Sequence, residues 1–167
     1  ITIREIARRC GVSHAAPVNQ FADRRALMTE IAIILFGELD DFIARSVSGL
    51  EGQPKEQVRI SGEMLVEYGL KHPNRYRLLW RRDLVDAGEP RLQKAMDNIY
   101  NALLTRIAAV NPRTRYDDDS IAIGIWSMAH GYTSLRLDGN FEARKDNVSG
   151  KDRQKSMFDA MLEMLEK

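Results

Sequence analysis

Five arginines and two side-chain amides gather near the start of the chain. Guanidinium groups bind phosphate oxygens in pairs, and side-chain amides offer a donor and an acceptor that match the edge of adenine. In the first thirty residues, five arginines against three acidic residues leave a local excess of two positive charges. This combination is typical of a surface that contacts DNA. The residues are Arg4, Arg8, Arg9, Arg24, Arg25, Asn19 and Gln20.

The elements that must position these side chains are a helix, a tight turn and a second helix. Apolar residues spaced by three and four over positions 3–10 form one helix face, and Gly11 then ends that helix. Ser13 is a suitable N-cap for a short second helix, and Asp23 for a long third helix to about Val47. A thin second helix can enter the major groove and read base edges, although many helical bundles contain a similar turn with no such role. The residues expected to contact DNA are Thr2, Arg4, Ser13, His14, Ala15, Pro17, Asn19, Gln20 and Arg24.

Aromatic, methionine and histidine side chains form a second candidate site. We expect it between the predicted helices that begin near Pro54, Pro90 and Asp118, with the long helix from Arg24 closing one side. Mostly apolar walls with a few polar tips are usual for a small-molecule site, and the absence of a fixed charge favours a neutral, aromatic or lipophilic ligand. The alternative is ordinary core packing, with His130 as a hydrogen-bonded core histidine. The expected lining is Phe36, Tyr68, Tyr76, Trp80, Met96, Tyr100, Trp126 and His130.

The sequence offers no support for metal or catalytic chemistry. His14, His72 and His130 lie far apart, without the spacing of a zinc site. The aspartates at 117–119 lack the pattern of a calcium loop and suit the positive end of a helix. No nucleotide-binding loop, nucleophile elbow or metalloprotease motif occurs. We therefore expect no metal, no cofactor and no enzymatic activity.

Composition indicates a globular, all-helical protein. The 167 residues are 44% hydrophobic and 29% charged, and the net charge of +1 means that DNA contact depends on a local patch. Apolar residues recur at helical spacing throughout and rarely alternate as in strands, which predicts an all-α fold. No apolar run reaches the length of a membrane span, so no membrane partner is expected. The lone Cys10 and the lack of a visible secretory signal favour a cytoplasmic location.

The segment from Ile121 to Leu137 is apolar on two faces. A helix of this kind is usually covered on both sides, and a second copy of the chain can cover one of them. The methionine-rich terminal helix, residues 151–167, can share that interface. The alternative is a central helix in a single-chain bundle. The expected dimer contacts are Ile121, Ile125, Met128, Tyr132, Phe158, Met161, Leu162 and Leu165.

Residue identities in both halves of the chain carry a family resemblance. A Gly-Val-Ser turn at 11–13, Phe21 and an Asp-Arg helix start at 23–24 stand in the order found in one motif. This segment resembles the helix–turn–helix of TetR-family transcriptional repressors. The Trp–His–Gly pattern within 126–131 is similar to one subclass of that family's C-terminal domains, as is the second-helix opening at 14–17. The resemblance covers essentially the whole chain.

The resemblance implies a DNA-binding domain at residues 1–30 and an effector-binding, dimerising domain at residues 31–167. It implies a homodimeric repressor that binds a palindromic double-stranded DNA operator and is released by a small molecule. Two features depart from the family pattern: we expect its first helix to be absent from this chain, and Val18 and Gln20 replace an aromatic residue and a histidine. A helical small-molecule-binding protein without operator recognition is therefore an alternative, and an all-α enzyme is another.

Overall fold

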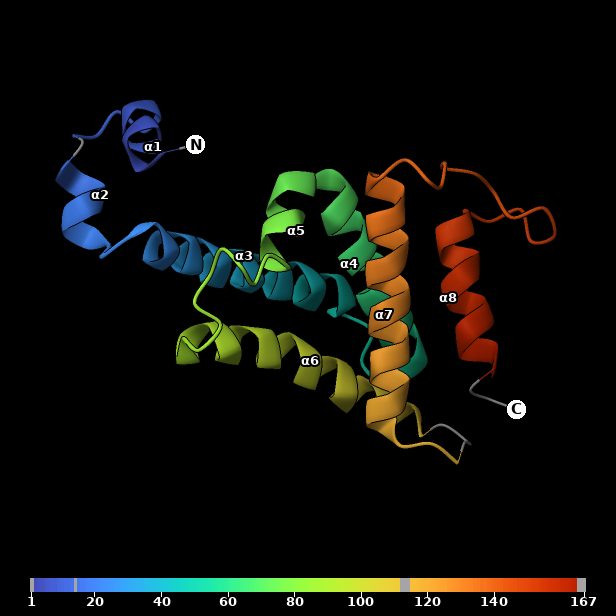
Figure 1. The fold of residues 1–167 in the computed structure, drawn as a ribbon. Helices are drawn as coiled ribbons and strands as arrows, with labels where there is room; N and C mark the ends of the chain where they lie inside the picture. Colours follow the sequence, from blue (N-terminus) through green and yellow to red (C-terminus); the bar gives the residue numbers. More distant parts are fainter. Residues whose placement is uncertain (1, 14, 112–114, 165–167) are drawn as a thin grey trace.

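The computed structural model describes residues 2–13, 15–111 and 115–164 (Figure 1). Over these ranges the chain is all-α, as predicted, and its extended residues form a single isolated bridge between Lys145 and Asp152. The helices are α1 (Ile3–Arg9), α2 (Ala15–Gln20), α3 (Arg24–Val47), α4 (Pro54–Lys71), α5 (Pro73–Leu79), α6 (Pro90–Val110), α7 (Asp118–Leu137) and α8 (Arg153–Met164).

Local sequence signals place the helix ends close to their predicted positions. The carboxylates of Asp23 and Asp117 cap α3 and α7, each accepting a backbone N–H of the first turn at 2.8 and 2.7 Å. Pro54 and Pro90 begin α4 and α6, where a missing N–H leaves no helical hydrogen bond unmade. Asn111 ends α6 in the left-handed conformation, with φ of 51°. The long helices therefore have chemically defined limits.

Helix α4 is the centre of the bundle and packs against α3, α6, α7 and α8. Two of its glycines lie at the closest approaches: a Cβ at Gly62 would overlap the Phe158 ring, and one at Gly69 would overlap the Thr133 methyl group. Phe158 is buried, so it anchors α8 on α4 at the end of a long connection. Interiors packed this closely tolerate little added volume.

Helix α3 connects the N-terminal helices to this bundle. Figure 1 shows α1 and α2 at one end of α3, apart from the other helices. Further along, α3 buries Leu35, Phe36 and Leu39 in the bundle core. One continuous helix therefore spans the distance between the two candidate sites.

Candidate functional site

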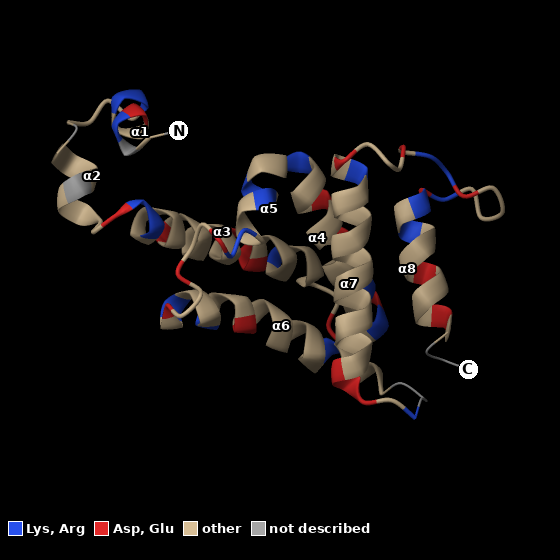
Figure 2. Cartoon of the chain, viewed as in Figure 1, with Lys and Arg blue, Asp and Glu red and all other residues tan. Residues whose placement is uncertain are grey.

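Helices α1 and α2 follow one another in the order that the predicted helix–turn–helix requires. Thr2 caps α1 by accepting the Glu5 N–H at 3.2 Å, and Gly11 turns the chain with φ of 68°, a conformation that favours glycine. Helix α2 carries no charged residue, whereas α1 and the start of α3 carry arginines (Figure 2). An uncharged helix between two basic segments suits contact with base edges by the helix and with phosphates by its neighbours.

The predicted DNA-contacting residues lie largely on the surface. Arg4 and Arg24 make no ion pair with the part of the chain that the structure describes, so their guanidinium groups are available. Arg8 and Arg9 instead both bond to Glu5, and Arg8 more than Arg9 lowers the pKa of that carboxyl to about 2. His14 lies outside the described residues. Exposed members of the set are Thr2, Arg4, Ser13, Ala15, Asn19, Gln20 and Arg24, and Pro17 is half-buried.

Aromatic side chains from several segments enclose a hollow in the C-terminal bundle. Trp80, just after α5, lies edge-on to Phe36 of α3 and to Trp126 of α7, with ring centroids 5.9 Å apart in each case. Tyr100 of α6 adds a ring 6.2 Å from Trp126. The hollow measures about 240 Å³, and one of about 250 Å³ that shares Phe36, Trp80 and Met96 adjoins it. We call the space lined by these five residues the aromatic cavity.

Charged side chains also border the aromatic cavity, which corrects the expectation of a lining without fixed charge. Asp97 lines both hollows and Arg82 lines the adjoining one. Both residues are exposed, so solvent screens their charges. Asp97 neighbours Met96 on α6, and Arg82 lies in a loop, where helical spacing predicts no orientation. The walls favour an apolar ligand body, and these groups favour a polar end.

Tyr76 and His130 form a polar pair next to Trp80. The Tyr76 hydroxyl lies 2.6 Å from His130 Nδ1, and the His130 ring centroid lies 4.7 Å from that of Trp80. Burial raises the pKa of Tyr76 to about 12 and lowers the pKa of His130. Near neutral pH both groups are therefore uncharged, and one hydrogen bond joins the hydroxyl to Nδ1. This pair supports the Trp80 wall of the aromatic cavity.

Acidification is expected to destabilise the protein through His130. Because burial lowers its folded-state pKa, the unfolded chain binds this proton more readily below the ordinary value of 6.5. The stabilisation is therefore complete above that pH and is lost as the pH falls through it towards the folded-state pKa. Thermal melts of wild type and His130→Gln between about pH 7.5 and pH 5 measure this, since Gln keeps an acceptor but does not titrate. Identical pH slopes for the two proteins would contradict the assignment.

Tyr68 does not share the aromatic cavity with the other predicted residues. Its side chain lines a separate hollow on the face formed by α3, α4 and the start of α5. Tyr68 is expected in the lining because of its residue type, and it is buried. Residue type does not tell which neighbouring helix an inward residue faces, because α4 has neighbours on several sides.

The residues predicted for the dimer seam mostly pack inside the single chain, which corrects their assignment as available surface. Ile125 is 2% exposed and Phe158 is 1% exposed, so neither offers area to a second molecule. On α7, the exposed apolar residues are instead Ile123 and Leu135. Both faces of α7 are apolar, and the sequence does not tell which face its own chain covers. Ile121, Ile125, Tyr132, Phe158 and Leu162 are buried, Met128 and Met161 are half-buried, and Leu165 lies outside the described residues.

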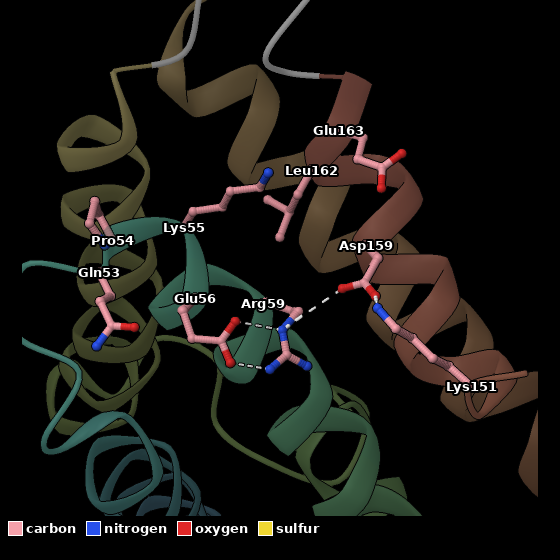
Figure 3. Close-up of a pocket in the computed structure, with 9 residues that line it drawn as sticks. All are labelled: Gln53, Pro54, Lys55, Glu56, Arg59, Lys151, Asp159, Leu162 and Glu163. Carbon is pink, nitrogen blue, oxygen red and sulfur yellow. Dashed lines mark hydrogen bonds and ion pairs between the residues drawn. The ribbon is translucent and has the colours of Figure 1, made fainter. Parts of the chain in front are cut away.

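A hollow of about 440 Å³ lies between the start of α4 and α8 and is lined largely by charged groups (Figure 3). Arg59 bonds to Glu56 and Glu63 of its own helix and lies 3.9 Å from Asp159 of α8. Asp159 also accepts a 2.6 Å ion pair from Lys151. Since these charges are mutually satisfied, they hold α8 against α4 and do not define a ligand site.

Comparison with known proteins identifies the C-terminal bundle. The family model for the tetracycline repressor-like C-terminal domain matches residues 58–165, more than half of the chain. The chain belongs to the TetR family. A protein of unknown function from Rhodococcus sp. RHA1 shares the fold of this TetR member, with a TM-score of 0.80 and 22% identity over 100% of this chain and 86% of that chain. No curated protein matches the sequence.

Membership of the TetR family makes this chain a regulator and points away from an enzyme. Over the residues that the structure describes, no helix combines the length and hydropathy needed to cross a bilayer. Within the same ranges, no group of three or more metal-ligating side chains gathers. The aromatic cavity is lined from the matched domain by Trp80 after α5 and by residues of α6 and α7, and α3 closes its remaining side.

Proposed function

We propose that this protein is a transcriptional repressor that binds a palindromic operator as a homodimer and is released by a small molecule. Residues 1–30 form the DNA-binding domain, and residues 31–167 bind the effector and dimerise. The effector has an apolar, aromatic body that fits the aromatic cavity. The observation that carries the proposal is the course of α3, which belongs to both domains.

The first turns of α3 follow α2 closely, since only residues 21–23 separate the two helices. The same helix contributes Phe36 to the wall of the aromatic cavity. An effector that moves Phe36 therefore acts on the helix that follows α1 and α2, the two helices that we propose bind DNA. A ligand shifts such an equilibrium only if it binds the two arrangements with different affinity, and contact with a shared element supplies that difference.

The loop between α5 and α6 gives a second link between cavity and DNA-binding end. Arg25 donates from Nε to the Val85 carbonyl at 2.9 Å, and the Asp86 N–H donates to Thr29 Oγ1 at 2.8 Å. Val85 also lines the hollow that adjoins the aromatic cavity. These bonds tie the cavity wall to the first two turns of α3, so displacement of the wall is transmitted towards α2.

The exposed stripe of α7 is the surface that we propose for dimerisation. Ile123, Ser127, Gly131 and Leu135 recur every four residues and therefore share one helix face. Ile123 is 52% exposed and Leu135 is 41% exposed, and Ile123 and Ser127 also line the edge of the aromatic cavity, so the proposed interface adjoins the effector site. A Cβ built at Gly131 meets no atom within 4 Å, which leaves space for a partner helix. Small residues between two large apolar ones allow a second α7 to approach closely.

Selection of operators from random double-stranded DNA tests the repressor proposal. The complete protein is expected to enrich an inverted repeat whose half-sites lie about 34–36 Å, or one helical turn, apart. The retained DNA is expected to dissociate when an effector is added in a gel-shift assay. Absence of any enriched sequence would favour the alternative, a helical small-molecule-binding protein without operator recognition.

Replacing Trp126 by leucine is expected to weaken ligand binding more than it weakens the fold. The change keeps apolar packing but removes the ring that faces Trp80 and Tyr100. Binding of the neutral aromatic probe N-phenyl-1-naphthylamine, followed by its fluorescence, is expected to weaken by roughly tenfold. A large loss of melting temperature with unchanged probe affinity would assign Trp126 to the core and place the effector elsewhere.

A further inference from the structure

A second hollow opens on the face of the bundle formed by α3, α4 and the start of α5, apart from the aromatic cavity. It measures about 240 Å³, and Tyr68 lines it. No residue of its lining belongs to the aromatic cavity. The repressor proposal above assigns it no role, and its properties are those of a ligand site.

Tyr68 lines this hollow and has a buried hydroxyl without a hydrogen-bond acceptor among the described residues. Its side chain is 4% exposed, and its buried hydroxyl oxygen makes no hydrogen bond within the described ranges. Burial and the Glu38 carboxylate raise the pKa of Tyr68 and outweigh the Arg75 guanidinium, so the hydroxyl keeps its proton; Arg75 can only donate to the hydroxyl oxygen, which leaves the O–H without an acceptor in the described part of the chain. Arg75 directs its own N–H to Glu38 at 2.7 Å. A buried donor left unpaired costs free energy that an acceptor on a ligand would recover.

The rim of the hollow carries more positive than negative charge. Arg75 and Glu38 neutralise one another through their ion pair. Arg45 and Lys71 remain as two cations without an ion pair to any residue that the structure describes, and Asp41 is the remaining carboxylate. The net charge that faces a ligand is therefore one positive, which matches a monoanion. A dianion would face repulsion from Asp41 without a further cation to offset it.

Two rings flank Tyr68 and define the shape of the occupant. The Phe42 centroid lies 6.3 Å from that of Tyr68, and the His72 centroid lies 5.3 Å from it. Both side chains also line the hollow. Rings on two sides of a buried hydroxyl favour a flat, apolar group beside the acceptor.

We propose that this hollow is a second ligand site, specific for a small aromatic monocarboxylate whose carboxylate accepts the Tyr68 hydroxyl between Arg45 and Lys71. A planar carboxylate suits both a hydroxyl donor and a guanidinium fork. The ring of the ligand lies against Phe42 and His72. The site shares only α3 with the aromatic cavity, and its occupancy does not depend on DNA binding.

Titration of the complete protein with benzoate, followed by amide NMR shifts, tests the site. We expect saturable shifts around His72 and Tyr68, and none of comparable size with benzamide, its neutral counterpart. Tyr68→Phe keeps the ring and removes only the donor. It is expected to weaken benzoate binding by about tenfold or more while the melting temperature of the free protein stays unchanged or rises.

Two charge variants are expected to change benzoate affinity in opposite directions, which a purely structural role of these residues would not produce. Lys71→Gln is expected to weaken benzoate binding and Asp41→Asn to strengthen it, each by about two- to fivefold. Lys94→Gln, an exposed cation on α6, is the matched control and is expected to leave binding unchanged. Equal benzoate affinity in wild type and Tyr68→Phe, shifts confined to the aromatic cavity, or tighter binding of inorganic phosphate would each overturn the proposal. None of these outcomes affects operator binding, so the two proposals fail separately.

Discussion

Ile125→Asp is expected to unfold the chain, whereas Ile123→Asp is expected to leave the fold intact and to separate the proposed dimer. Ile125 is 2% exposed and lies among core residues of α4 and α6, so a carboxylate there is buried in a mostly apolar surrounding. Such a substitution costs several kcal/mol, on the order of the whole stability of a domain. Ile123 is 52% exposed in the single chain, so the same charge there meets water until a second copy covers it.

Light scattering and circular dichroism distinguish the two variants. Ile123→Asp is expected to have native helix content and half the mass of the wild type in solution. Its operator affinity is expected to be lost, because a monomer contacts only one half-site. Ile125→Asp is expected to be insoluble or to have lost its cooperative melt. Ile123→Val, which keeps the surface apolar, serves as the matched control and is expected to remain dimeric. A dimeric Ile123→Asp protein would show that the stripe of α7 is not the interface.

The fold was predictable because its determinants are local. Helix-forming periodicity, together with Asp and Pro at helix starts, identified α3, α4, α6 and α7. Asp23 and Asp117 are N-caps that the sequence reveals directly, and the structure places both carboxylates on backbone N–H groups. The glycines at 62 and 69 carry no such local signal. Their importance comes from Phe158 and Thr133, which lie far away in the sequence.

The sequence predicted which types of residue line the candidate sites, but only partly which of these residues lie together in one cavity. Phe36, Trp80 and Trp126 converge as expected, because each lies on the inner face of its segment. Tyr68 is equally inward-facing but meets a different set of helices, since its position around α4 turns it towards α3 and α5. The spacing of residues in one amino-acid sequence does not tell how its helices are oriented relative to one another. For that reason pockets are harder to predict than helices.

The prediction of the dimer contacts was limited in the same way, because the sequence does not tell which face of α7 is buried. Its buried stripe and its exposed stripe are both apolar, and the hydrophobic pattern shows two faces without assigning either. The assignment follows from tertiary packing, because α4 and α6 cover the face of Ile121 and Ile125. What remains exposed, including Ile123 and Leu135, is the face that the chain itself leaves uncovered.

Asn19→Ala and Arg24→Ala are expected to impair DNA binding in different ways. Asn19 is exposed on the uncharged helix α2, where its amide suits an adenine edge. Its loss is expected to relax the preference for one base pair, at a cost of about 1–3 kcal/mol on the best operator. Arg24 is exposed at the first position of α3 without an ion pair to the described residues, which suits a phosphate.

Loss of Arg24 is therefore expected to weaken binding to all sequences about equally and to reduce the salt dependence by about one released counterion. Binding to a library of single-base operator variants at two salt concentrations separates the two effects. Arg8→Ala is the matched control, because its guanidinium is already bonded to Glu5 and is expected to contribute less to DNA affinity. If Asn19→Ala and Arg24→Ala gave the same sequence profile and the same salt slope, α2 would not be the helix that reads the bases.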